Sequence, residues 1–221
     1  MADRITVLSS DADGRCLIIG LKLDTDTCIK LVKVYFPCYS SKSDYKAELG
    51  HCLGFIENSV AISDKTVIMG DMNFECQENN AGYVMCNTVF SSLNISCCDN
   101  LCQAPQLSTY CNDALGCSSF IDHCFVSDSI RTCVSSVSII DSGCNLSDHR
   151  PIAATFVFSD LRMDKGHKNS PSTALPYIVG GGINRIVTIT MTALVSVWAM
   201  QLHLHTLFHV YLTVVVRIIQ F

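Results

Sequence analysis

The chain has no excess of basic residues. Its 221 residues include 15 Lys and Arg against 20 Asp and Glu, which gives a formal net charge of −5. A protein that grips nucleic acid mainly through the phosphates carries a basic stripe or patch. The charge balance therefore argues against tight binding to DNA as such. It leaves room for a brief enzymatic encounter with DNA.

The chain also lacks paired cysteine ligand sets, although it has 14 cysteines. The spacings among Cys97, Cys98, Cys102 and Cys111 do not give the CxxC pairs typical of zinc sites. We therefore expect reduced, mostly buried cysteines that pack as small hydrophobic side chains. The glycine run 180–182 has no following Lys-Ser or Lys-Thr, so we interpret it as a flexible joint and not as a phosphate-binding loop.

Hydrophobic periodicity predicts an α/β fold. Runs over residues 15–23 and 28–36 predict two strands that are covered on their faces. Apolar positions at helical spacing predict helices over 43–59 and 83–93, with a short buried strand over 66–69 between them. The later β runs are 95–98, 107–111, 119–126, 133–140 and 152–158. Helices early and strands later favour a sandwich of two packed sheets.

Composition changes after Phe158. We expect a domain over residues 1–158, a linker over 159–182 and an apolar tail over 183–221. No charged residue lies between Arg185 and Arg217. Residues 186–202 are the best candidate for a transmembrane helix, which needs about 20 apolar residues. Basic residues before this segment would keep the N-terminal domain cytoplasmic at a membrane; without insertion of the tail, we expect an intracellular protein.

Three short strings place an acid beside an amide or an imidazole. They are Gly70-Asp71-Met72-Asn73, Ile121-Asp122-His123 and Ser147-Asp148-His149-Arg150-Pro151. Each could be a surface turn, because Asp and Asn favour turns. Three such strings in one chain, each next to an apolar run, instead favour a shared site. A buried carboxylate needs a partner, and carboxylates with an imidazole suit metal-assisted hydrolysis of a phosphate ester.

In this order the three strings resemble the active-site segments of the endonuclease/exonuclease/phosphatase superfamily, which has the DNase I-like fold. The string Lys33-Val34-Tyr35-Phe36-Pro37 resembles the Val-Tyr-x-Pro segment of that family. The sequence of residues 120–127 is most similar to that of the endonuclease domains of LINE-type (non-LTR) retrotransposons. The resemblance covers roughly residues 5–158 and implies a Mg²⁺-dependent phosphodiesterase, with DNA as the ancestral substrate.

The resemblance also implies catalytic roles for five residues. Asp71 would orient or deprotonate the attacking water, and Asn73 would hydrogen-bond the phosphate. His149 would stabilise the transition state, with Asp122 fixing its ring as carboxylates fix metal-bound imidazoles elsewhere. Tyr35 would donate its hydroxyl to the phosphate.

A metal role follows from the same resemblance. Asp148 would help to hold Mg²⁺, or Mn²⁺ in its place. Thr109 lies where the family often has a threonine before the Ile-Asp strand.

The resemblance fails at the front of the chain. The family opens with a strand that carries an Asn and then a metal-binding Glu, but no Glu precedes Glu48 here. We therefore expect a fold that is incomplete at the N-terminus and an enzyme that is weak or inactive. One alternative is a non-catalytic retrotransposon remnant with a spurious or membrane-anchoring tail. Another is a membrane-anchored phosphoesterase that acts on lipid or inositol phosphates.

Overall fold

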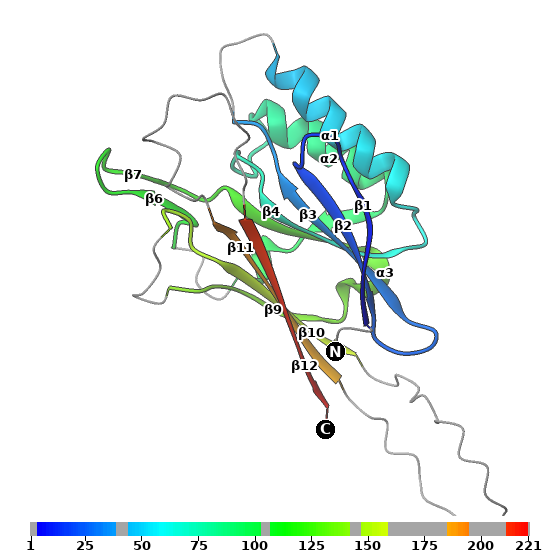
Figure 1. Ribbon diagram of the computed structural model, residues 1–221. Coiled ribbons are helices and arrows are strands. Elements are labelled where there is room, and N and C mark those ends of the chain that lie inside the picture. Colours follow the sequence, from blue (N-terminus) through cyan, green and yellow to red (C-terminus); the bar gives the residue numbers. More distant parts are fainter. Residues whose placement is uncertain are drawn as a thin grey trace, which may run out of the picture.

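The protein is known from a computed structural model, which describes residues 4–38, 44–102, 107–141, 147–158, 185–194 and 211–220. Within these ranges a six-stranded sheet, a four-stranded sheet, a two-stranded hairpin and two longer helices make up the fold (Figure 1). The helices cover one face of the larger sheet, and the smaller sheet covers the other. This is the two-sheet α/β sandwich of the DNase I-like fold, as the sequence predicts.

The larger sheet has six strands in the order β1-β2-β3-β4-β8-β5. Strands β3 and β4 are parallel, and each other neighbouring pair is antiparallel. The central strands are rich in Val, Ile and Leu because both of their faces are covered. Their bounds are β1 (Ile5–Ser10), β2 (Cys16–Lys22), β3 (Cys28–Tyr35), β4 (Lys65–Asp71), β5 (Ile95–Cys97) and β8 (Asp122–Ser127).

Helices α1 (Tyr45–Ser59) and α2 (Ala81–Ser92) lie where the periodicity predicts them. Helix α1 buries residues at helical spacing against the larger sheet, among them Leu49, Leu53 and Ile56. Helix α2 begins at Ala81, two residues before the predicted start. The reason is the side chain of Asn80, which accepts hydrogen bonds from the free backbone N–H groups of Gly82 and Tyr83.

The smaller sheet is antiparallel, in the order β12-β11-β10-β9. Its strands are β9 (Val134–Ile139), β10 (Ile152–Phe158), β11 (Arg185–Leu194) and β12 (Tyr211–Gln220). Between the sheets lies the intersheet core, which includes Met69, Val126, Ile152, Phe156 and Ile189. On the opposite face of the larger sheet lies the helix-side core, which includes Ile68, Phe36, Phe90 and Phe125.

The predicted transmembrane helix over 186–202 is wrong for residues 186–194, which belong to strand β11. These residues pair along their whole length with β12, and residues 186–191 also pair with β10. Ile, Val and Thr dominate the segment, and β-branched side chains favour strands over helices. Residues 195–202 and the predicted linker 159–182 lie outside the described residues. The boundary at Phe158 stays a prediction.

No helix in the described parts of the chain combines the length and hydrophobicity that a membrane crossing requires.

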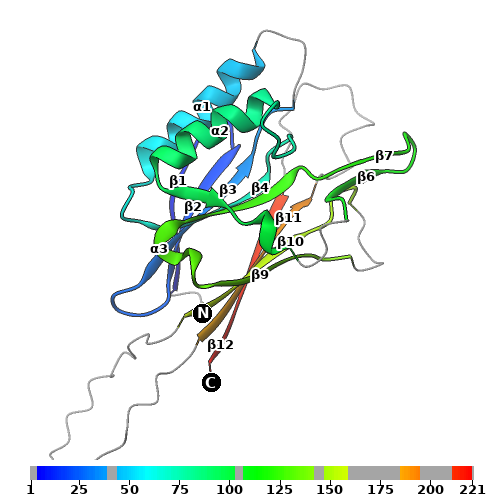
Figure 2. The same ribbon diagram turned by 180° about the vertical axis from the view of Figure 1, so that it is seen from behind.

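Two predicted strands are shorter than expected. The run 119–126 is interrupted at Phe120 and Ile121, and the run 107–111 forms a strand only from Tyr110. A separate hairpin of β6 (Tyr110–Asn112) and β7 (Cys117–Ser119) extends away from the sheets (Figures 1 and 2). Two short elements complete the fold, the 3₁₀ turn η2 (Asp99–Leu101) and helix α3 (Asp128–Arg131).

The described cysteines are all free thiols, as expected. Their predicted burial is only partly right. Cys16, Cys52, Cys86, Cys98 and Cys124 are buried, but Cys28, Cys38 and Cys117 are exposed and the others are partly buried.

Candidate active site

Three predicted site residues form a row across the larger sheet. Asp71 is the last residue of β4, and its register partners are Tyr35 on β3 and Asp122 on β8. Directly opposed residues on neighbouring strands point their side chains to the same face. The fold therefore places Tyr35, Asp71 and Asp122 side by side, although they are far apart in sequence. Asp71 and Asp122 are both buried.

Gly70 allows β4, which ends at Asp71, to lie very close to β3. Its φ angle is +144°, a conformation that side chains rarely adopt. A Cβ atom at this position would lie 2.0 Å from the carbonyl oxygen of Val34. Only glycine fits here, which accounts for the Gly-Asp dipeptide of the first string.

Asn73 completes a tight turn directly after Asp71. Its backbone N–H donates to Asp71 Oδ1 at 2.9 Å, and its φ angle is 54°. Its side-chain Nδ2 donates to the carbonyl oxygen of Phe36 at 2.8 Å and to Asp71 Oδ2 at 3.3 Å. Asn73 thus fixes the orientation of the Asp71 carboxylate. Its predicted bond to a phosphate stays a prediction.

Thr109 holds the start of β8 in place. Its hydroxyl oxygen accepts hydrogen bonds from the backbone N–H groups of Ile121 and Asp122, both at 3.0 Å. The side chain is fully buried. These two bonds also explain why the predicted strand is interrupted here, since the N–H groups bond to a side chain and not to a neighbouring strand. Thr109 therefore positions Asp122.

His149 reaches this row from the segment that precedes β10. A backbone bridge pairs it with Tyr110, and its ring lies 5.2 Å from the Tyr110 ring, centroid to centroid. Ring atom Nδ1 donates to Asp122 Oδ2 at 2.9 Å, so the predicted pairing is present. Ring atom Nε2 lies 3.7 Å from Asp71 Oδ2. The imidazole therefore stands between two carboxylates.

Burial and charge shift the titration of this cluster. Burial, followed by the negative charge of Asp122, raises the pKa of Asp71 to about 7. Burial alone would lower the pKa of His149, but the hydrogen bond to Asp122 and the charges of the neighbouring aspartates raise it overall. A carboxyl group with a pKa near 7, next to an imidazole whose pKa is raised, suits proton transfer.

The other two predicted residues lie at the margin of the cluster. Tyr35 is partly buried, and burial raises the pKa of its hydroxyl, as do the charges of Cys38 and Asp71. The Asp148 side chain is exposed, while its backbone oxygen accepts from the N–H of Cys111 at 2.8 Å. Ligand atoms of Asp71, Asp122 and His149 lie within 4.8 Å of one another, and Asp148 does not belong to that group.

The family assignment rests on a match that spans most of this fold. The family described as "Endonuclease-reverse transcriptase" matches residues 29–153, which include all three strings. The chain belongs to the endonuclease/exonuclease/phosphatase superfamily. It is therefore a nuclease or phosphodiesterase domain of that superfamily.

Solved structures of this superfamily share the fold at low sequence identity. An AP endonuclease from Archaeoglobus fulgidus is 13% identical, with a TM-score of 0.53, over 68% of this chain and 70% of that one. The 3′ phosphatase NExo from Neisseria, bound to a product DNA hairpin, is 15% identical, with a TM-score of 0.51, over 69% and 70%.

The endonuclease domain of TRAS1, a telomere-specific non-LTR retrotransposon, is 15% identical, with a TM-score of 0.48, over 66% and 75%. No curated protein matches the chain.

Sequence reasoning missed a second polar cluster beside this site. His123 follows Asp122 on β8, so its side chain points to the opposite face of the sheet. There it meets Asp99 and Cys76, with ring atom Nδ1 2.6 Å from Asp99 Oδ2. The spacing of these residues along the chain gives no signal. The pairing of β8 with both β4 and β5 brings them together.

Proposed function

We propose that this chain is a Mg²⁺-dependent endonuclease domain of retrotransposon type that hydrolyses phosphodiester bonds in DNA. The observation that carries the proposal is the convergence of Asp71, Asp122 and His149 from β4, β8 and the segment before β10. The family match to an endonuclease supports DNA as the substrate.

The donor set at this site fits a hard divalent cation. Asp71, Asp122 and the adjacent Asp148 offer carboxylate oxygens, which Mg²⁺ prefers. The two buried carboxylates also repel each other, and that repulsion contributes to the raised pKa of Asp71. Asp148 and Asp71 would hold the cation, which supplies positive charge against the charge that develops on the phosphate.

The protein groups divide the remaining work. Asp122 accepts a hydrogen bond from Nδ1 of His149 and so fixes the ring with Nε2 toward Asp71. A protonated Nε2 can donate to a phosphate oxygen and stabilise its charge in the transition state. Asp71, oriented by Asn73, can accept a proton from the attacking water. Tyr35 lies in the same row and can donate its hydroxyl to the phosphate.

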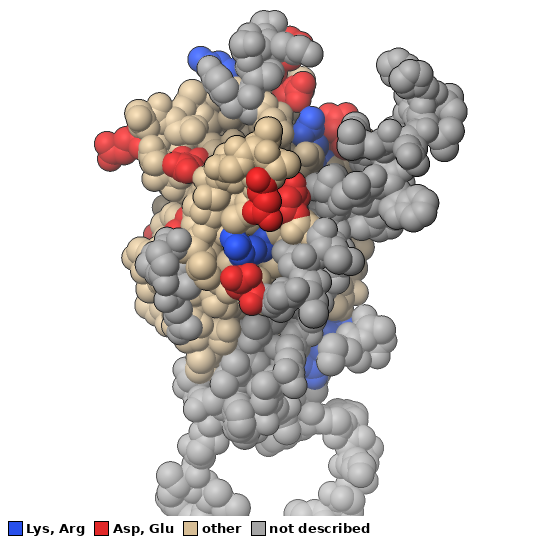
Figure 3. Space-filling model, turned by 90° about the vertical axis from the view of Figure 1, so that its left-hand side faces the viewer, with Lys and Arg blue, Asp and Glu red and all other residues tan. Residues whose placement is uncertain are grey.

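We expect the activity to be low. The three candidate metal-ligand groups among the described residues contain no glutamate, and the centre has two aspartates and one histidine. The face in Figure 3 adds little electrostatic attraction, since its Lys and Arg side chains are scattered among Asp and Glu side chains. Substrate capture would then depend on the site itself and on the cation.

A plasmid-nicking assay tests the proposal. Supercoiled plasmid is incubated with the chain and Mg²⁺, and the nicked fraction is followed over time. His149→Ala should lower the rate by about 100-fold or more, because general acid–base and electrostatic help are lost together.

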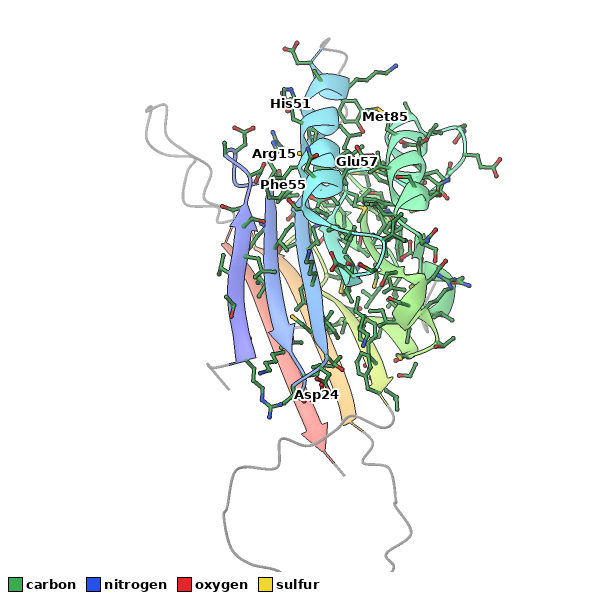
Figure 4. The ribbon with its side chains drawn as sticks, turned by 90° about the vertical axis from the view of Figure 1, so that its right-hand side faces the viewer. Arg15, Asp24, His51, Phe55, Glu57 and Met85 are labelled. Carbon is green, nitrogen blue, oxygen red and sulfur yellow. The ribbon has the colours of Figure 1, made fainter. Side chains whose placement is uncertain are left out.

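The matched control is His51→Ala, because His51 is an exposed histidine on α1 (Figure 4). This variant should nick as fast as the unchanged chain. Equal rates for the unchanged chain and His149→Ala would identify the activity as background and refute the proposal.

A further inference from the structure

We propose that a zinc ion binds on the helix-side face of the larger sheet, behind the candidate active site. Its ligands come from the loop after β4, the end of β5, the turn η2 and strand β8. They are Cys76, Cys97, Asp99 and His123.

The ligand atoms already converge. Those of Cys76, Asp99 and His123 lie within 4.8 Å of one another. His123 Nδ1 is 3.4 Å from Cys76 Sγ and 2.6 Å from Asp99 Oδ2. Cys97 Sγ lies 3.5 Å from the backbone N of Asp99, and Cys97 packs against the same helix-side core as Cys76. Two thiolates, one imidazole and one carboxylate are a donor set suited to tetrahedral zinc.

The ring of His123 is oriented as a metal ligand would be. Its Nε2 lies 2.7 Å from the carbonyl oxygen of Phe74, which can only accept, so Nε2 carries a proton. In zinc sites the second ring nitrogen commonly donates to a backbone carbonyl in this way. The lone pair of Nδ1 is then directed at Asp99 and Cys76, and a cation or a second proton must lie between them.

The rest of the pocket supports the same geometry. Asp99 Oδ1 accepts from the backbone N–H of Cys124 at 3.3 Å, which leaves Oδ2 for the cation. The His123 ring stacks on Phe74 at 5.8 Å between centroids. His123 is almost fully buried, while the Asp99 side chain is 20% exposed and gives a metal ion an entry path.

Only a small rearrangement is required. With ligands about 2.0–2.3 Å from zinc, neighbouring ligand atoms in a tetrahedron are roughly 3.3–3.8 Å apart. The contact between Nδ1 and Cys76 Sγ is already in this range. Nδ1 and Asp99 Oδ2 would separate by about 0.7 Å.

A second cysteine cluster is the main competitor for the metal. Asp11, Cys16 and Cys52 also have ligand atoms close together. That group has no imidazole, and both of its cysteines are buried. We therefore assign the metal to the group around His123.

Metal titration of the reduced, chelator-stripped chain tests the proposal. With Mg²⁺ in excess to fill the candidate active site, zinc chloride should bind with one ion per chain and raise Tm by roughly 5–10 °C at a hundredfold excess over Kd. Cobalt chloride should give the sulfur-to-metal charge-transfer absorption of a thiolate site. Cys76→Ser and Asp99→Asn should each weaken zinc binding by at least tenfold. Cys28→Ser, a change at an exposed cysteine elsewhere, should have no effect.

Spectroscopy keeps the test decisive if a variant folds poorly. Cys97→Ser should lower the charge-transfer intensity per bound cobalt by about half, because one of two thiolates is lost. Three results would overturn the proposal. They are the absence of stoichiometric zinc binding, its loss in Cys52→Ser but not in Cys76→Ser, and a cobalt complex without the thiolate band.

Discussion

Gly70 controls how closely the strand that bears Asp71 approaches its neighbour. We predict that Gly70→Ala lowers the free energy of unfolding by about 2–4 kcal/mol, because the new Cβ atom meets the Val34 carbonyl in a backbone conformation unfavourable for alanine. Urea unfolding followed by circular dichroism measures the change.

Gly50 supplies the matched control for that experiment. It is exposed in the middle of α1, and a Cβ atom added there would have no neighbour within 4 Å. Gly50→Ala should instead raise the stability by about 0.5–1 kcal/mol, since alanine favours the helix. If both substitutions changed the free energy of unfolding by a similar amount, the close approach at Gly70 would not contribute to stability.

Thr109 acts on the site through the backbone. We predict that Thr109→Val lowers stability by about 1–3 kcal/mol, because the N–H groups of Ile121 and Asp122 lose their buried acceptor. The nicking rate should fall about tenfold as Asp122 loses its fixed position.

Thr109→Ser retains the hydroxyl, so it should keep most of both properties. If Thr109→Val nicked DNA as fast as the unchanged chain, the positioning role of Thr109 would be disproved.

Single residues were predictable where one short string held several polar groups. Asp71, Asp122 and His149 each stand in such a string, and the structure brings all three together. Asp99 and Cys76 could not be found in this way. Their nearest partner, His123, is 24 positions from Asp99 and 47 from Cys76, so only strand pairing unites them.

At the scale of elements, the start of α2 depends on a single side chain. We predict that Asn80→Ala lowers stability by about 1 kcal/mol, because two N–H groups in the first turn lose their acceptor. Asn80→Asp keeps the acceptor and should be neutral or slightly stabilising. An unchanged midpoint of thermal unfolding in Asn80→Ala would show that the cap contributes nothing.

The helices and the strand β10 were predictable because their periodicity is clear and local. Strand β11 was not. Its apolar, uncharged stretch satisfies the composition of a membrane span as well as that of a strand buried in a sandwich. The deciding factor is the hydrogen-bonded edge that β10 offers, which no local pattern reveals. The short strands β6 and β7 form because they pair with each other in a hairpin, and the local sequence pattern does not predict that pairing.

Arg15 and Asp24 mark opposite ends of the larger sheet in Figure 4. Arg15 bonds to Glu48 of α1 at 3.1 Å, and its guanidinium lies 5.8 Å from the centre of the Tyr35 ring. Asp24 accepts from the N–H groups of Asp26 and Thr27 in the turn between β2 and β3. Arg15 therefore links the active-site end of the sheet to helix α1, and Asp24 stabilises the turn at the opposite end.

At the scale of the whole molecule, two cores share the larger sheet. Phe90 is fully buried in the helix-side core, with its ring 5.0 Å from that of Phe125, and Phe156 is fully buried in the intersheet core. We predict that Phe90→Ala and Phe156→Ala each cost about 3–5 kcal/mol.

Because the sheet is common to both cores, each variant should still unfold in one transition by fluorescence and circular dichroism alike. Two separate transitions in either variant would show that the layers fold independently.

Strand β8 has a consequence for how this protein tolerates change. Asp122 and His123 are consecutive, and the pleat sends one to the intersheet face and the other to the helix face. Loss or gain of a single codon just upstream would invert that alternation. Asp122 would then face the cysteine cluster, and His123 would face the aspartates of the candidate active site. A single insertion or deletion would therefore disrupt both sites.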